Sequence, residues 1–140
     1  MIRHLSPTEK SQKDFYQSYK CKGPIVMLNM LKFRKLTDYK DHPSLDPGNE
    51  ISGQEAYRLY SAATLPLVQK AGGEVVYFGS IANFLIGPED EHWDAILLVR
   101  YPAVEKFIAF AGSEEYLKTA GHRTASLEDS RLLPTALPSM

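Results

Sequence analysis

Two short stretches of the chain are apolar at nearly every position, residues 25–33 (IVMLNMLKF) and residues 93–101 (WDAILLVRY). A strand points successive side chains to opposite faces, so each of these strands would present apolar side chains on both sides. Such strands are typical of the centre of a sheet that is covered on both faces. We therefore predict that these stretches are the central strands of one sheet and that Pro102 ends the second.

The segments between and after these strands have helical patterns with recognisable ends. Ser52 and Glu55 form a capping box, and an apolar stripe then runs to the glycine pair at residues 72–73. A second helical pattern follows residue 102, is broken at Gly112 and restarts at Ser113, which has the character of an N-cap. The sequence thus predicts one long helix and one interrupted helix.

Two further strands complete the pattern. Residues 75–86 read as a strand bent at Gly79, and the polar turn at residues 87–92 joins it to residues 93–101 as an antiparallel hairpin. Residues 130–133 read as a short last strand, closed by proline. The predicted order is β-α-β-β-α-β, the split βαβ arrangement, in which the first and third strands are central.

The predicted helices are enough to cover only one face of such a sheet. The other apolar face would remain open, and an open apolar face usually marks a site for a partner. The simplest partner is a second copy related by a two-fold axis. We therefore expect a homodimer in which two sheets pack face to face.

The ends of the chain lie outside this pattern. We divide the chain into an N-terminal helical extension at residues 1–22, one folded domain at residues 23–134 and a C-terminal tail at residues 135–140. The charged, proline-containing stretch at residues 34–51 reads as a long loop, either mobile or placed over a pocket.

Composition narrows the classes of function. The chain has 140 residues, 44% hydrophobic content and a net charge of −1, which fits one globular domain and argues against nucleic acid or anionic membranes as partners. No apolar run approaches the roughly 18 residues of a membrane span, and the N-terminus has no signal-peptide pattern, so we expect a cytoplasmic protein. The single cysteine, Cys21, reads as a reduced thiol without a special role.

No strong catalytic or cofactor motif is present. None of the four histidines stands at metal-ligand spacing from another, and there is no glycine-rich phosphate loop and no nucleophile elbow. We therefore expect no metal and no cofactor.

Three side chains in apolar surroundings are candidates for binding a ligand. Asn29 lies in a row of apolar strand positions and needs a partner, either neighbouring backbone or a ligand. Tyr57, at the edge of the helix stripe, either packs in the core or extends its hydroxyl into a cleft. Trp93 either packs or lines a pocket for a flat apolar molecule.

Three charged or titratable side chains are candidates for chemistry. Arg123 either forms a salt bridge, for example with Asp94 or Asp129, or binds a ligand carboxylate in a bidentate way. Asp94, next to an indole, would become a general acid or base if burial raised its pKa. His122 would titrate near neutral pH.

Several separated blocks of the sequence match one family in order. The blocks NMLKF, SGQEAYRLY, GGEVVYFG, WDAILLVRYP and HRTASLEDSRLLP resemble the DUF1330 family, over most of residues 23–134. The resemblance implies an α+β, ferredoxin-like fold with a four-stranded antiparallel sheet, in the dimeric α+β barrel superfamily. That superfamily includes cofactor-independent monooxygenases and isomerases, and the DUF1330 family itself has no assigned reaction. Arg123 matches an arginine the family tends to carry, whereas Ala103 stands where the family usually has a serine cap.

Two functions are compatible with these residues. In the first, the protein is a dimer that binds a small apolar or aromatic carboxylate without turnover, through Asn29, Tyr57, Trp93 and Arg123. In the alternative, the same pocket belongs to a cofactor-independent enzyme, in which Asp94 or His122 moves a proton. A purely structural dimer is the third possibility, because a shared fold does not transfer an activity.

Overall fold

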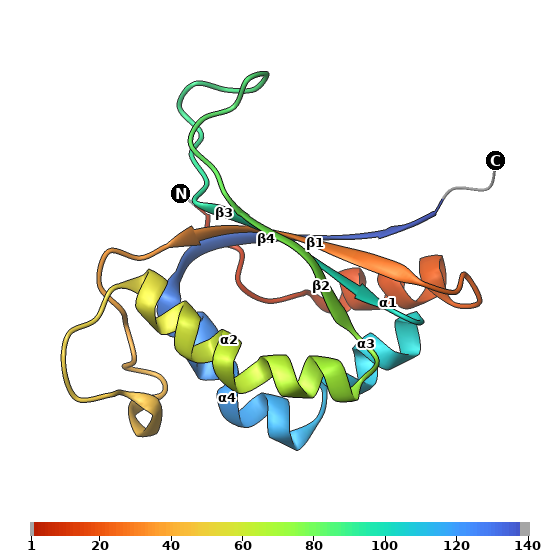
Figure 1. The fold of residues 1–140 in the computed structure, drawn as a ribbon, viewed down its shortest axis with the longest axis horizontal. Helices are drawn as coiled ribbons and strands as arrows, with labels where there is room; N and C mark the ends of the chain where they lie inside the picture. The colour runs from red at the N-terminus through yellow and green to blue at the C-terminus, as the bar shows by residue number, and fades with distance from the viewer. Residues whose placement is uncertain (1, 138–140) are drawn as a thin grey trace.

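The computed structural model describes residues 2–137 and contains one four-stranded antiparallel sheet (Figure 1). Its strands are β1 (Ile25–Phe33), β2 (Glu74–Ser80), β3 (Ala95–Tyr101) and β4 (Leu127–Ala136). Their order across the sheet is β2-β3-β1-β4. The two strands that are apolar on both faces, β1 and β3, are therefore the central pair, as predicted.

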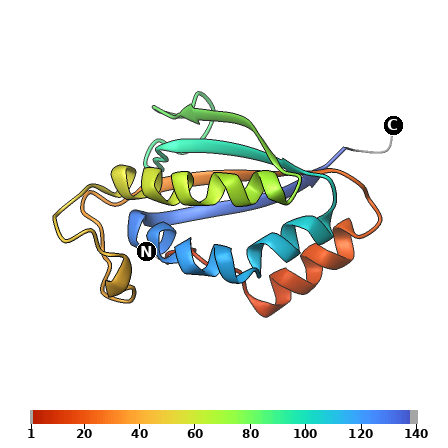
Figure 2. The same cartoon turned by 60° about the horizontal axis from the view of Figure 1, so that its bottom comes forward.

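The helices form a single layer on one side of this sheet (Figures 1 and 2). They are α1 (Glu9–Tyr19), α2 (Gly53–Lys70), α3 (Val104–Ala111) and α4 (Glu114–Ser126), and a short 3₁₀ helix, η1, spans Pro43–Leu45. Both predicted N-caps form: the Ser52 hydroxyl accepts from the amide of Glu55 at 3.1 Å, and the Ser113 hydroxyl accepts from the amide of Tyr116 at 3.2 Å. The predicted capping box is only half formed, because the Glu55 carboxylate accepts from the Ser52 hydroxyl, at 3.3 Å, and not from the Ser52 amide. After α1, the chain follows the predicted β-α-β-β-α-β order.

The boundaries of three strands were predicted wrongly. Strand β2 ends at Ser80 and β3 starts at Ala95, because residues 81–94 leave the sheet instead of extending the hairpin. Strand β4 is much longer than the predicted residues 130–133 and pairs with β1 over its whole length. Pro134 lies within it, which an edge strand tolerates because one side of its backbone needs no partner.

Two more local expectations were wrong. The irregularity in β2 lies between Val75 and Tyr77, at Val76, and not at Gly79. Residues 135 and 136, placed in the predicted tail, continue β4, and residues 138–140 lie outside the described part of the chain.

The N-terminal helix α1 extends the helix layer alongside α3. The ring of Phe15 packs edge-on against Phe107 at a centroid distance of 5.6 Å, and the Tyr19 hydroxyl donates to the carbonyl of Pro134 at 2.8 Å. Both contacts join α1 to the main fold. Within residues 2–137, no helix has the length and apolar character needed to cross a bilayer.

The face of the sheet away from the helices is apolar and carries no helix among residues 2–137 (Figure 1). Strand register places on this open face the side chains of Val26, Leu28, Met30, Tyr77, Ile96, Leu98 and Leu133. None of these residues is fully buried, and Tyr77 is 56% exposed. The expected open sheet face is therefore present.

Candidate functional site

The helix layer does not seal the middle of the sheet face that it covers. On that face Met27 and Leu31 are 2% and 0% exposed, at either side of Asn29. Asn29 itself pairs with Leu97 on β3 and Leu132 on β4, and all three residues in this row keep part of their exposure to solvent. Solvent therefore reaches the centre of the sheet between two buried parts of the core.

Two polar atoms near this row have no protein partner. The amide nitrogen of Asn29 donates to the carbonyls of Leu97 at 3.2 Å and Met27 at 3.4 Å, which leaves its Oδ1 free. The hydroxyl of Tyr57 makes no hydrogen bond within residues 2–137. In that part of the chain, Arg34 Nε is the only fully buried side-chain nitrogen or oxygen without a partner. Asn29 Oδ1 and Tyr57 Oη therefore retain contact with solvent.

Tyr57 belongs to a group of three neighbouring tyrosines, with Tyr60 on α2 and Tyr116 on α4. Its ring lies 5.2 Å from that of Tyr60, whose hydroxyl is 2.8 Å from the Tyr116 hydroxyl. Burial raises the pKa of Tyr57 to about 12, although the nearby Arg123 guanidinium acts in the opposite direction. Burial, reinforced by Tyr116, also raises the pKa of Tyr60 well above its usual value. These hydroxyls are protonated at neutral pH and can donate hydrogen bonds.

Arg123 supplies a positive charge beside these tyrosines without an acidic partner. Its Nη1 donates to the Leu5 carbonyl at 2.8 Å and its Nη2 donates to Ser130 Oγ at 3.3 Å. No ion pair joins Arg123 to an acidic side chain within residues 2–137, so the expected salt bridge to Asp94 or Asp129 is not formed. Asp129 pairs with Arg131 instead, at 2.8 Å. An anion would therefore be attracted to Arg123.

Trp93 lies on the other side of the sheet from this group. Its Nε1 donates to Glu91 at 2.8 Å, and the guanidinium of Arg131 stacks over its ring at 5.0 Å. Arg131 pairs with Met30, an open-face position, whereas its neighbour Ser130 faces the helices and contacts Arg123. The sheet therefore separates Trp93 from Arg123.

The two candidates for proton transfer have hydrogen-bond partners other than Arg123 and Tyr57. Asp94 is exposed at the end of the sheet, and its carboxylate accepts from the amide of Phe33 at 2.7 Å. His122 Nδ1 lies 2.8 Å from the hydroxyl of Tyr39, in the long loop, and burial lowers its pKa. The structure therefore places Tyr57 near Arg123 and puts Asn29 on the same face of the sheet, whereas Asp94 and His122 are engaged with other partners.

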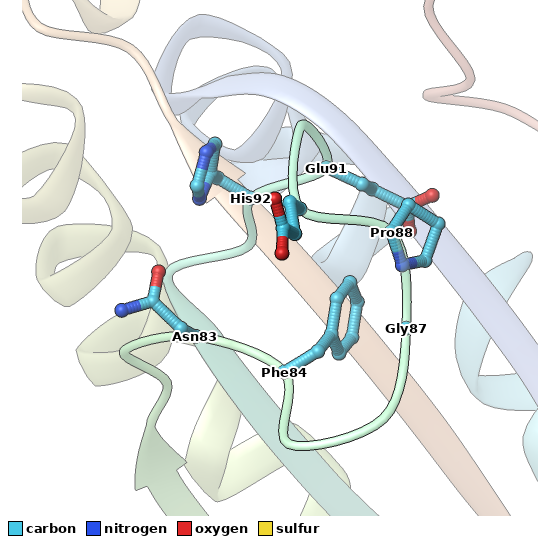
Figure 3. A pocket seen from close by; sticks show the side chains of 7 residues that line it. Asn83, Phe84, Gly87, Pro88, Glu91 and His92 are labelled. Atoms are coloured by element: carbon cyan, nitrogen blue, oxygen red, sulfur yellow. The ribbon is translucent and has the colours of Figure 1, made fainter.

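The loop at residues 34–51 folds onto the helices rather than over the Asn29 row. The amide of Asp38 donates to the Ala125 carbonyl at 3.1 Å, and η1 packs against Gly121 so closely that a Cβ there would lie 2.6 Å from the His42 ring. A surface hollow of about 290 Å³ lies in this loop, lined by Thr37, Tyr39, Asp46, Gly48, Asn49 and Glu50. A second hollow, of about 160 Å³, lies in the loop between β2 and β3 (Figure 3). Neither is lined by a predicted site residue.

Sequence reasoning missed several residues of the tyrosine–arginine group. Tyr60 and Tyr57 are three residues apart in one helix, a spacing that places them on the same face and could have been noticed. Tyr116, Ser130 and Leu5 come from distant segments, and no pattern joins them in the sequence. Within residues 2–137, no three His, Cys, Asp or Glu side chains gather to hold a metal ion.

Comparison with known proteins places the chain in a family. The family model described as a domain of unknown function, DUF1330, matches residues 48–134. The chain belongs to the DUF1330 family. No curated protein matches it.

Solved structures of similar proteins agree with this assignment. The RPA0582 protein of unknown function from Rhodopseudomonas palustris is 34% identical, with 99% of this chain and 100% of that chain covered and a TM-score of 0.86. Hydroxynitrile lyase from Passiflora edulis is 12% identical, with coverages of 85% and 97% and a TM-score of 0.56. A dimeric protein of unknown function from Bacteroides fragilis with a ferredoxin-like fold is 11% identical, with coverages of 81% and 96% and a TM-score of 0.50. The DUF1330 chain thus has the predicted ferredoxin-like fold.

Proposed function

We propose that this DUF1330 protein is a homodimer that binds a small apolar or aromatic carboxylate between its sheet and its helices, without turnover. The ligand carboxylate binds Arg123, and the Tyr57 hydroxyl donates a further hydrogen bond to it. The apolar part of the ligand lies along the row of Asn29 and Leu97.

The observation that carries this proposal is the unbalanced charge of Arg123. Among residues 2–137 its guanidinium bonds only to a carbonyl and a hydroxyl, and it lies next to the buried Tyr57. Removing a cation from water without an anionic partner is costly, and a carboxylate would supply that partner. Asn29 and Leu97 keep part of their exposure to solvent on the same face of the sheet, and the proposal places the apolar part of the ligand there.

Binding is favoured over catalysis by where the titratable groups lie. Within residues 2–137, neither the Asp94 carboxylate nor the His122 ring is hydrogen-bonded to Arg123 or Tyr57. The alternative, a cofactor-independent enzyme at the same site, would have to use a tyrosine hydroxyl whose pKa is raised by burial, a poor base at neutral pH. The hydroxynitrile lyase of similar fold shows that this architecture can support an enzyme, which keeps the alternative worth testing.

The dimer forms through the open sheet face in this proposal. Burying that apolar face removes it from water, and two sheets packed face to face lie about 10 Å apart, so their side chains fill the space between them. Sedimentation velocity should show a dimer at low micromolar concentration, and a monomer at about 50 μM would contradict this part of the proposal.

The ligand site is tested by thermal shift and calorimetry with benzoate and phenylacetate as probes, and benzyl alcohol as the uncharged comparison. We expect the acids to raise the melting temperature and the alcohol to have no effect. Arg123→Gln should weaken acid binding by roughly 10- to 100-fold, the range for a lost charge-assisted hydrogen bond. Recovery of the probe unchanged after prolonged incubation would distinguish binding from turnover.

A second variant keeps the test valid if Arg123→Gln does not fold. Tyr57→Phe removes a hydroxyl without a protein partner, so it should leave stability nearly unchanged and still weaken the binding of benzoate. Tyr19→Phe is the matched control, because its hydroxyl bonds to the Pro134 carbonyl far from Arg123. Equal benzoate affinity in wild type, Arg123→Gln and Tyr57→Phe would refute the site.

A further inference from the structure

The connection between β2 and β3 is an arm that stands out from the open face. Residues 81–94 join the two strands, whereas hairpin connections usually contain about two to five residues. The arm rises from the sheet on the side opposite the helices (Figure 1). At its tip Leu85 and Ile86 are 98% and 92% exposed, the highest values among the large apolar side chains in the described residues.

The base of the arm is fixed to the sheet. The amide of Ile81 donates to the Asp94 carbonyl at 2.9 Å, and the amide of Asp94 donates to the Leu31 carbonyl at 2.8 Å. Trp93 is held between Glu91 and Arg131, which bind its Nε1 and its ring. These contacts fix the direction of the arm, so its apolar tip is presented in one orientation.

One apolar side chain of the arm packs within the arm itself. Phe84 turns into the curve of the loop, where it helps line the hollow of about 160 Å³ with Gly87, Pro88 and His92 (Figure 3). Leu85 and Ile86, in contrast, are not covered by the arm itself. The arm therefore uses one apolar side chain for its own packing and leaves the next two for another surface.

The arm is long enough, when extended, to span more than the spacing of two packed sheets. An extended chain advances about 3.3 Å per residue, so the stretch from Ile81 to Leu85 can span roughly 13 Å. Two sheets packed face to face lie about 10 Å apart. If a second copy covers the open face, the tip of each arm therefore extends beside the body of the other subunit.

We propose that residues 81–94 form an arm that clasps a second copy of this chain, with Leu85 and Ile86 buried against the partner subunit. This inference rests on the proposed dimer and adds a second contact region to it, outside the sheet faces. The two-fold axis makes both arms equivalent, so one dimer buries four of these tip side chains. Their burial explains why exposed leucine and isoleucine occur on an anchored loop.

The test compares Leu85→Ser/Ile86→Ser with wild type by sedimentation velocity over a range of concentrations. Loss of four buried side chains should weaken the dimer by roughly 100-fold or more. The control is Leu36→Ser/Leu117→Ser, which removes two side chains that are 57% and 59% exposed elsewhere on the molecule. Circular dichroism and urea unfolding verify that each variant is folded.

A second measurement locates the arm directly. The only native cysteine is first removed by Cys21→Ser, and a benzophenone maleimide is attached at Leu85→Cys. On illumination this probe should cross-link the two subunits of the dimer, whereas the same probe at Leu117→Cys should not. If the wild-type protein is a monomer, both the proposed dimer and the proposed arm contact are refuted. A wild-type dimer that Leu85→Ser/Ile86→Ser leaves equally tight would refute the arm alone. Wild-type binding to phosphatidylcholine vesicles, lost in a variant that still dimerises normally, would also refute it and make the tip a membrane contact.

Discussion

Among the described glycines without a positive φ, replacement by alanine should destabilise the fold most at Gly53. Gly53 opens α2 at a junction of three segments: its amide donates to the Arg34 carbonyl at 2.9 Å, and the amide of Arg34 donates to the Ser126 carbonyl at 2.9 Å. An added Cβ would lie 2.4 Å from each of those two carbonyl oxygens and 2.6 Å from the Arg34 nitrogen.

The size of the effect follows from the rigidity of those neighbours. All three atoms are backbone, and non-bonded heavy atoms prefer separations of roughly 3.5 to 4.0 Å, so the end of β1, the end of α4 and the start of α2 must move apart. Overpacking of this kind costs typically about 1–3 kcal/mol, and each weakened backbone hydrogen bond adds about 1 kcal/mol. We expect Gly53→Ala to lower the free energy of unfolding by about 2–5 kcal/mol.

The assay is urea unfolding followed by circular dichroism, with Gly112→Ala as the matched control. Gly112 has a φ of −96°, and a Cβ there would meet only the Ile108 carbonyl at an ordinary 3.4 Å. The control should change stability by less than about 1 kcal/mol in either direction. If Gly53→Ala unfolds at the same urea concentration as Gly112→Ala, the three segments are not as tightly joined as the distances indicate.

Two further predictions concern buried hydroxyl and imidazole groups. Tyr116→Phe removes the partner of the Tyr60 hydroxyl and should lower the free energy of unfolding by about 1 kcal/mol in urea, while Tyr77→Phe, on the open face, should not. Because burial lowers the pKa of His122, folding favours its neutral form, so this stabilisation is complete above the unfolded pKa of about 6.5 and is lost as pH falls through the lower folded value. His122→Gln should therefore lose less stability than wild type between pH 7.5 and pH 5, and equal losses would contradict this account.

The architecture could be predicted because the signals that define it are local. Apolar residues on both faces of residues 25–33 and 93–101 required two central strands, and β1 and β3 occupy those positions. The strand ends were less predictable, because they depend on pairing. Residues 81–86 have a strand-like composition, but the hairpin register ends at Ser80 and Ala95, so they form the arm instead.

The candidate site was only partly predictable. The alternation of side chains along a strand can be read from the local sequence, but the way the strands and helices are assembled cannot. Alternation along β1 placed Asn29 in an apolar row, and the burial of Met27 and Leu31 shows that this row is on the face of the sheet that the helices cover. Alternation along the strands could not show that Trp93 and Arg123 lie on opposite sides of the sheet. The position of Trp93 depends on where β3 begins, and the position of Arg123 depends on which side chains of β4 face α4. The Leu5 contact with Arg123 depends on an N-terminal segment that has no periodic signal at all.

The two proposals assign different roles to the two faces of the sheet, and the division can be tested as a whole. The proposed ligand contacts, Arg123 and Tyr57, lie on the helix side, whereas Trp93, Arg131 and the proposed dimer arm lie on the open side. A ligand effect that depends on Arg123 and persists in Leu85→Ser/Ile86→Ser would show that binding occurs within each subunit. A ligand effect lost in both variants would mean that the partner helps to form the site. Ser130 and Arg131 are adjacent in β4 and face opposite sides, so β4 is the element through which coupling between dimer formation and ligand binding would have to pass.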